Sequence, residues 1–150
     1  MQLKNIKNIT VYFSDKSAPI KRPIVNEDIA AGFPSPAEDF KEIRISLDKE
    51  LVKNEDATFY ARVRGNSMID ANIEDGDLLV IDRSIETRNG KVAVCMIDGE
   101  FTIKRLKVEK DCVYLMPENK KYKPIKVTEE NELIIWGIVT YVIKKVSTIL

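Results

Sequence analysis

The sequence contains no histidine, and this absence excludes more than any other feature of its composition. A Ser-His-Asp triad, a Cys-His pair, a His-ligated metal and a Cys2His2 zinc finger all require imidazole. Hydrolytic chemistry in this chain would therefore depend on Ser, Thr, Lys, Asp, Glu, Tyr or Cys side chains. We expect neither a cofactor nor a bound metal.

Cysteine is also scarce, since the chain has only Cys95 and Cys112 and they form no CxxC motif. Cys95 lies in the apolar run 92–97, where a buried core thiol is expected. The lack of a disulfide framework favours a reducing, cytoplasmic environment.

Net charge and long hydrophobic runs are missing as well. The 24 basic and 24 acidic residues cancel, so no overall field attracts nucleic acid or an anionic membrane, and sequence-specific DNA binding is not expected. The longest apolar run, Leu133–Ile143, is far shorter than the roughly 18 to 20 residues that span a bilayer. The first residues resemble no secretory signal, so we expect no membrane partner.

The hydrophobic pattern divides the chain near residue 57. We expect residues 1–56 to form an N-terminal arm, because four of the six prolines fall within residues 14–42. Within the arm, Ile9–Phe13 predicts a short strand and Phe33–Pro36 an extended segment. A short helix is predicted after Ser46 as its N-cap, ending near residue 54.

Residues 57–150 predict a mainly β domain with a small, barrel-like sheet. Apolar and polar residues alternate from Phe59 to Arg64, and Asp98-Gly99 between two apolar runs is a strong hairpin signal. Gly137, inside an apolar run, indicates a bulge or a close approach of two strands. The remaining expected strands lie at Leu78–Ile81, Lys91–Ile97, Glu100–Val108, Cys112–Met116 and Leu133–Lys145.

Ser67 follows a predicted strand and Gly65, where a tight turn would expose its hydroxyl at a sheet edge. In that position the backbone N–H groups of Asn66 and Ser67 would converge and could form an oxyanion hole. The alternative is that Ser67 caps a short helical turn beginning at Met68. The spacing alone leaves both interpretations open.

Lys104 is the lysine best placed to serve as a base for such a serine, because a base lysine must be neutral and therefore desolvated. The two-residue period of a strand places it on one face with Thr102, Leu106 and Val108. If that face is the core side, the amine is buried. If the polarity is reversed, the amine is in water.

Several separate segments resemble the catalytic boxes of the LexA/UmuD group of Ser-Lys self-cleaving proteins. They are Gly65–Met68, Asp75–Val80 and Asp98–Leu106, and the arm segment Ala31–Phe40 resembles the UmuD branch in particular. The resemblance implies a LexA/UmuD-like C-terminal domain with an extended N-terminal arm.

The same resemblance implies the roles of individual residues. Ser67 would be the nucleophile and Lys104 its base, and the backbone N–H groups of Ser67 and Asn66 would hold the oxyanion. The bond that is cut would be Ala31-Gly32.

For the UmuD branch, the implied function is an accessory subunit in the SOS response. A RecA filament on single-stranded DNA would stimulate self-cleavage, and the trimmed homodimer would join a UmuC-type Y-family polymerase for error-prone translesion synthesis. Only 31 residues precede Gly32, without a helix pair or basic patch, which argues against a repressor. A LexA-like self-cleaving regulator, or a binding module with a vestigial dyad, are the alternatives.

Overall fold

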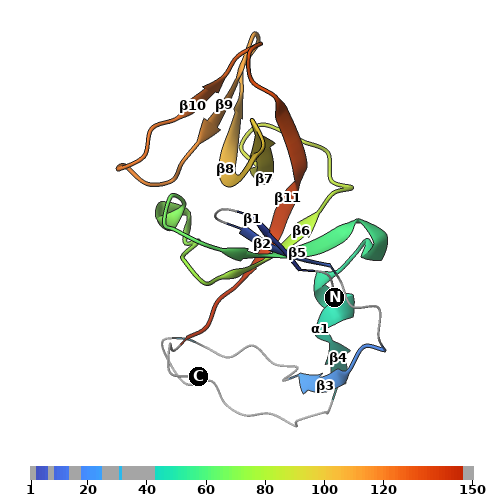
Figure 1. Ribbon diagram of the computed structural model, residues 1–150. Helices are drawn as coiled ribbons and strands as arrows, with labels where there is room; N and C mark the ends of the chain where they lie inside the picture. Colours follow the sequence, from blue (N-terminus) through green and yellow to red (C-terminus); the bar gives the residue numbers. More distant parts are fainter. Residues whose placement is uncertain (1–2, 7–8, 14–17, 25–30, 32–42, 147–150) are drawn as a thin grey trace. The chain divides into compact units, whose positions relative to one another are not determined.

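The computed structural model describes residues 3–6, 9–13, 18–24, 31 and 43–146. The chain forms two compact units, one of Met1–Asp15 with Asn54–Leu150 and the other of Lys16–Lys53 (Figure 1). Each unit is described by itself below.

The larger unit contains a nine-stranded antiparallel sheet with the order β1-β2-β5-β6-β11-β7-β8-β9-β10. Two short 3-10 helices, η1 (Glu55–Ala57) and η2 (Ile69–Ala71), flank β5. The strands are β1 (Leu3–Ile6), β2 (Ile9–Phe13), β5 (Thr58–Val63), β6 (Leu78–Asp82), β7 (Val92–Ile97), β8 (Glu100–Val108), β9 (Val113–Met116), β10 (Ile125–Val127) and β11 (Leu133–Ile143).

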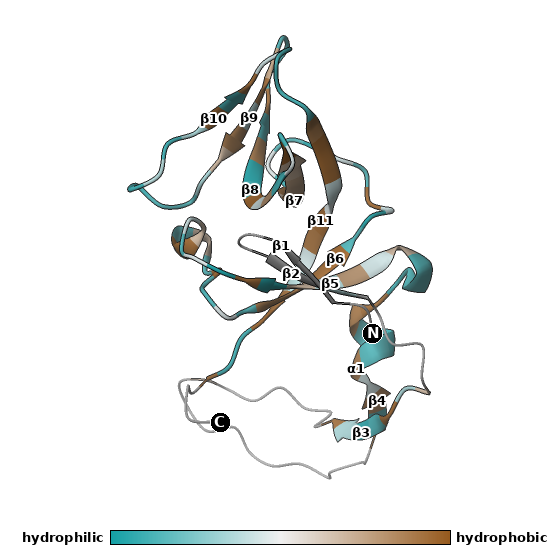
Figure 2. Cartoon of the chain, in the orientation of Figure 1, coloured by the Kyte–Doolittle hydropathy of each residue, from teal (hydrophilic) through white to brown (hydrophobic). Residues whose placement is uncertain are grey.

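The central strand of the sheet, β11, pairs with β6 on one side and β7 on the other (Figure 1). Figure 2 shows that β11 is largely hydrophobic. On this strand Trp136 packs edge-to-face against Phe59 of β5, with ring centroids 5.8 Å apart, and against Phe101 of β8, at 4.7 Å. Strands far apart in the sheet order therefore share one core, which confirms the mainly β, LexA/UmuD-like fold.

The hairpin of β7 and β8 is the element that the sequence predicts best. Asp98 and Gly99 both adopt positive φ, 49° and 81°, as a two-residue turn of this kind requires. A second core cluster forms where β7, β8, β9 and β11 meet, around the fully buried Cys95 and Leu115. The expectation of a core thiol at position 95 is confirmed.

The boundary of the sheet differs from the expected division at residue 57. Strand β2 pairs with β5 in antiparallel register from Ile9↔Val63 to Phe13↔Phe59, and β1 pairs with β2. Residues 3–6 and 9–13 thus add two strands to the sheet instead of belonging to the arm. The alternation of apolar and polar residues in 9–13 predicts a strand, but it does not predict which strand pairs with it.

The smaller unit contains a two-stranded antiparallel sheet, β3 (Lys21–Ile24) and β4 (Ile43–Ser46), followed by helix α1 (Leu47–Leu51). The Ser46 hydroxyl accepts a hydrogen bond from Lys49 N–H at 3.5 Å, which confirms the predicted N-cap. The helix ends three residues before the expected residue 54. The predicted extended segment Phe33–Pro36 lies outside the described residues.

None of the helices that the structure describes is both long enough and apolar enough to cross a membrane.

Gly137 lies in β11 next to the residues that pair with the end of β6, and the register of β11 against β7 shifts between Ile135 and Gly137. A Cβ atom at this position would lie 2.6 Å from Ile81 Cγ2 and 3.2 Å from the Asp82 carbonyl oxygen. The expectation of a bulge with close packing is confirmed.

We expect Gly137→Ala to lower the free energy of unfolding by about 1 to 3 kcal/mol, because the neighbouring strand must move to admit the methyl group. Urea denaturation measures this loss. Val142→Thr, an exposed change on the same strand, is the control and should have an effect below about 0.5 kcal/mol. Equal stability of Gly137→Ala and the wild type would contradict the close approach.

Candidate active site

Strand β5 ends at Val63, and the chain then turns through Gly65 into the loop that carries Ser67. Gly65 has φ +86°, a conformation that other residues rarely adopt, and its N–H donates to Asp75 Oδ1 at 2.7 Å. Met68, next to the serine, is buried in the core that contains Phe59. The loop is therefore fixed on both sides of Ser67.

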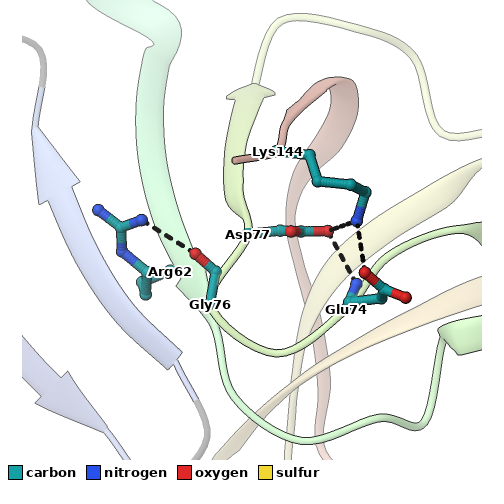
Figure 3. A network of polar contacts seen from close by, with 5 residues as sticks. All are labelled: Arg62, Glu74, Gly76, Asp77 and Lys144. Atoms are coloured by element: carbon teal, nitrogen blue, oxygen red, sulfur yellow. Dashed lines mark hydrogen bonds and ion pairs between the residues drawn. The ribbon is translucent and has the colours of Figure 1, made fainter. Parts of the chain in front are cut away.

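The turn of residues 74–77, whose Asp75 accepts the hydrogen bond from Gly65, is held in place by ion pairs and hydrogen bonds (Figure 3). The buried Asp77 carboxylate accepts a hydrogen bond from Glu74 N–H at 2.8 Å and pairs with Lys144, which also contacts Glu74 Oε2 at 3.2 Å. The Gly76 carbonyl accepts from Arg62 Nη1 at 3.0 Å. These contacts join the turn to β5 and to the chain just after β11.

Ser67 does not cap a helix. The short helix η2 that follows has Met68 at its N-cap position, without a side-chain capping hydrogen bond. Of the two interpretations of Ser67 that the spacing left open, capping is excluded by this geometry. The hydroxyl of Ser67 is instead directed to Lys104.

Lys104 lies in the middle of β8 and is only 7% exposed. Its Nζ lies 3.1 Å from Ser67 Oγ, 2.6 Å from Thr102 Oγ1 and 3.1 Å from the Ile103 carbonyl oxygen. The core side of β8 therefore includes the face of Thr102 and Lys104. Burial does not extend to the end of the strand, where Val108 is 44% exposed.

Burial lowers the pKa of Lys104, since desolvation disfavours the charged ammonium. Cys95 acts on the same amine and raises its pKa, but the effect is smaller. The Cys95 thiol is itself neutral, because burial raises its pKa to about 12. The thiol therefore places no negative charge next to Lys104 at neutral pH.

Nζ of Lys104 donates to three acceptors, Ser67 Oγ, Thr102 Oγ1 and the Ile103 carbonyl oxygen. A charged ammonium has three N–H donors and can satisfy all three acceptors. A neutral amine has two N–H donors and one lone pair, so the same geometry then lets one hydroxyl donate to the nitrogen. Proton removal from Ser67 requires this neutral form, with the Ser67 hydroxyl as the donor.

Ser67 and Lys104 lie at an open pocket of about 150 Å³. Among the backbone hydrogen bonds of the residues that the structure describes, none is donated by the N–H groups of Asn66 and Ser67. Ala31 is exposed, and Gly32 lies outside the described residues. The other residues that line the pocket are Val63, Arg64, Gly65, Met68, Thr102, Ile103 and Tyr122.

The contacts of three residues at this site are not predicted from the sequence. Thr102 was placed on the face of Lys104 but not in contact with its amine, although the spacing of two residues was a usable signal. Asn119 and Tyr122 bind the Asn66 backbone and side chain, at 2.8 and 2.9 Å, from a segment more than 50 residues away. No local pattern indicates such a contact.

No group of three or more Cys, Asp and Glu side chains suited to a metal ion occurs among the residues that the structure describes.

Comparison with known proteins decides the family. The model of the family described as Peptidase S24-like matches residues 23–140, which include both Ser67 and Lys104. The chain belongs to this family. Its resemblance to the LexA/UmuD group is thereby confirmed.

Several curated relatives of this S24-like chain match most of its length. MucA proteins of Salmonella typhimurium and Escherichia coli are 41% identical over 79% of the chain and 82% of MucA. SamA of Salmonella typhimurium is 37% identical over 82% of the chain and 85% of SamA. A LexA repressor of Alcanivorax borkumensis is 40% identical over 77% of the chain but only 55% of the repressor.

The lowered pKa of Lys104 predicts a pH-dependent cost to stability. Below its folded pKa the amine is charged in both states, and burial opposes folding in full. Between that pKa and 10.5 the unfolded chain binds the additional proton, so the free energy of unfolding rises with pH. The cost is about 1.4 kcal/mol for each pH unit between the two pKa values.

We therefore expect Lys104→Met to be more stable than the wild type at neutral pH, with an advantage that shrinks as the pH approaches 10.5. Urea denaturation at several pH values measures the difference. Lys91→Met, at an exposed position immediately before β7, controls for the change of charge. An advantage that stays constant with pH would show that burial of the ammonium is not its cause.

Proposed function

We propose that this protein is a self-cleaving serine peptidase of the UmuD kind that uses Ser67 as nucleophile and Lys104 as base. The observation that carries the proposal is the 3.1 Å contact between Ser67 Oγ and the buried amine of Lys104. Membership of the S24-like family supports it. The β-rich domain, residues 57–150 together with the strands β1 and β2, is the peptidase, and the arm that follows β2 carries its substrate bond, Ala31-Gly32.

In the proposed reaction, Ser67 Oγ attacks the carbonyl carbon of Ala31 while neutral Lys104 takes the hydroxyl proton. The backbone N–H groups of Ser67 and Asn66 stabilise the oxyanion of the tetrahedral intermediate. When the C–N bond breaks, Lys104 returns the proton to the amine of Gly32, and Ala31 remains as an ester on Ser67. A water molecule, deprotonated by Lys104, then hydrolyses the ester and restores the serine.

The biological role that we propose is SOS mutagenesis in the cytoplasm. Self-cleavage is stimulated by a RecA filament on single-stranded DNA, and the trimmed homodimer serves a UmuC-type Y-family polymerase during translesion synthesis. Support comes from the relatives, since MucA and SamA are 41% and 37% identical to this chain. The resemblance of the segment Ala31–Phe40 to the UmuD branch favours the UmuD kind over a LexA-like regulator.

The proposal predicts that the wild type, incubated at alkaline pH, yields a fragment beginning at Gly32. Ser67→Ala should stay full-length, because it removes the attacking oxygen and little else. Intact mass and N-terminal sequencing measure both outcomes. A different new N-terminus would contradict the Ala31-Gly32 assignment, and cleavage of Ser67→Ala would contradict the nucleophile.

The same assay with RecA, ATP and single-stranded DNA tests the regulation. We expect faster cleavage only when all three are present. A wild type that stays intact under every condition would favour the alternative of a binding module with a vestigial dyad. A gel-shift assay on duplex DNA tests the repressor alternative, for which specific binding is the supporting result.

A further inference from the structure

The segment Glu118–Tyr122, which connects β9 and β10, lies across the loop that carries Ser67. Four hydrogen bonds join the two. Glu118 N–H donates to the Ser67 carbonyl at 2.9 Å, and the Glu118 carbonyl accepts from Asp70 N–H at 2.7 Å. Asn119 Nδ2 donates to the Asn66 carbonyl at 2.8 Å, and the Tyr122 hydroxyl donates to Asn66 Oδ1 at 2.9 Å. We call Glu118–Tyr122 the strap.

Two contacts hold the Asn66 carbonyl and so help to direct the next N–H: the Asn119 side chain, at 2.8 Å, and the Ile69 N–H, at the longer distance of 3.3 Å. In a trans peptide the carbonyl of one residue and the N–H of the next point in opposite directions. The peptide between Asn66 and Ser67 is trans, so holding the Asn66 carbonyl on one side directs the Ser67 N–H to the other. That N–H is one of the donors that our proposed function assigns to the oxyanion.

The strap is also tied to the strand that supplies the base. Glu118 Oε1 pairs with Arg105 Nε at 2.6 Å, and Arg105 Nη1 donates to the Gly90 carbonyl at 2.7 Å. Arg105 is the neighbour of Lys104 on β8, and its side chain points away from the face of that lysine. A closed path thus runs from Ser67 through Glu118 and Arg105 to Lys104 and back to Ser67.

We propose that Asn119 is a positioning residue that aligns the Ser67 N–H for the oxyanion through the Asn66–Ser67 peptide plane. This inference rests on the proposed function. Asn119 does not touch the reacting atoms, and no described contact joins it to Lys104. Its loss should therefore lower the rate of the chemical step without altering the protonation of the base.

The test is the pH profile of self-cleavage for Asn119→Ala, followed by intact mass. Removal of a whole oxyanion donor costs about 100- to 1,000-fold in other enzymes, so a misaligned one should cost about 10- to 100-fold. We expect this drop at the high-pH plateau, with the midpoint of the profile unchanged. Asn119→Asp keeps the acceptor for Lys121 N–H but lacks the donor, so it should fall at least as far.

Asn131→Ala is the matched control, because Asn131 makes comparable bonds in the turn before β11. Its Nδ2 donates to Asp98 Oδ2 at 2.7 Å, and its Oδ1 accepts from Thr128 N–H at 2.9 Å. We expect Asn131→Ala to lose about as much thermal stability as Asn119→Ala but to keep the plateau rate of the wild type. If the plateau rate of the Asn119 variants falls only in proportion to the fraction of protein that is unfolded, the inference is overturned.

A second readout does not depend on activity. In a Ser67→Ala background, Asn119→Ala should shift the backbone amide resonance of residue 67 in ¹H-¹⁵N spectra, whereas Asn131→Ala should not. An unchanged amide resonance overturns the inference, and so does an unchanged plateau or a midpoint that moves instead of the plateau. In each of these cases the proposed function stands if the wild type cleaves. A wild type that never cleaves overturns both.

Discussion

The contact between a buried amine and a serine hydroxyl is the constraint on which the rest of this structure depends. Lys104 is only 7% exposed, so a charged amine there lowers the free energy of unfolding, and desolvation lowers its pKa. In the reaction that we propose, the same burial favours the neutral amine, whose lone pair would accept the proton of Ser67, 3.1 Å away. One structural feature, the burial of Lys104, then accounts for both the cost to stability and the proposed chemistry.

Strand β8 makes this burial possible because it contributes to both hydrophobic clusters. Phe101 and Ile103 belong to the cluster that contains Trp136 and Met68, and Leu106 belongs to the one around Cys95. Lys104 lies between these residues in the strand, opposite Ala93 of β7. The loop of Ser67 is brought to it by Met68 in the core and by the strap outside the core. Stability of the sheet and geometry of the site are therefore coupled.

What could be predicted from the sequence was mostly local. The Asp98-Gly99 turn and the Ser46 cap depend on residues a few positions apart, and both were predicted correctly. The burial of Lys104 was left open, because it depends on which strands flank β8. The pairing of β2 with β5 and the contact of Asn119 with Asn66 join segments about 50 residues apart, and no periodicity encodes them.

The most direct test of the account compares two titrations. One is the rate of wild-type self-cleavage against pH, and the other is the titration of the Lys104 ε-methylene carbon, observed by NMR in uncleavable Ser67→Ala protein. If neutral Lys104 is the base, both should have the same midpoint, below the ordinary lysine value of 10.5. A cleavage rate that does not change with pH, or a Lys104 that titrates at its ordinary value, would contradict the account.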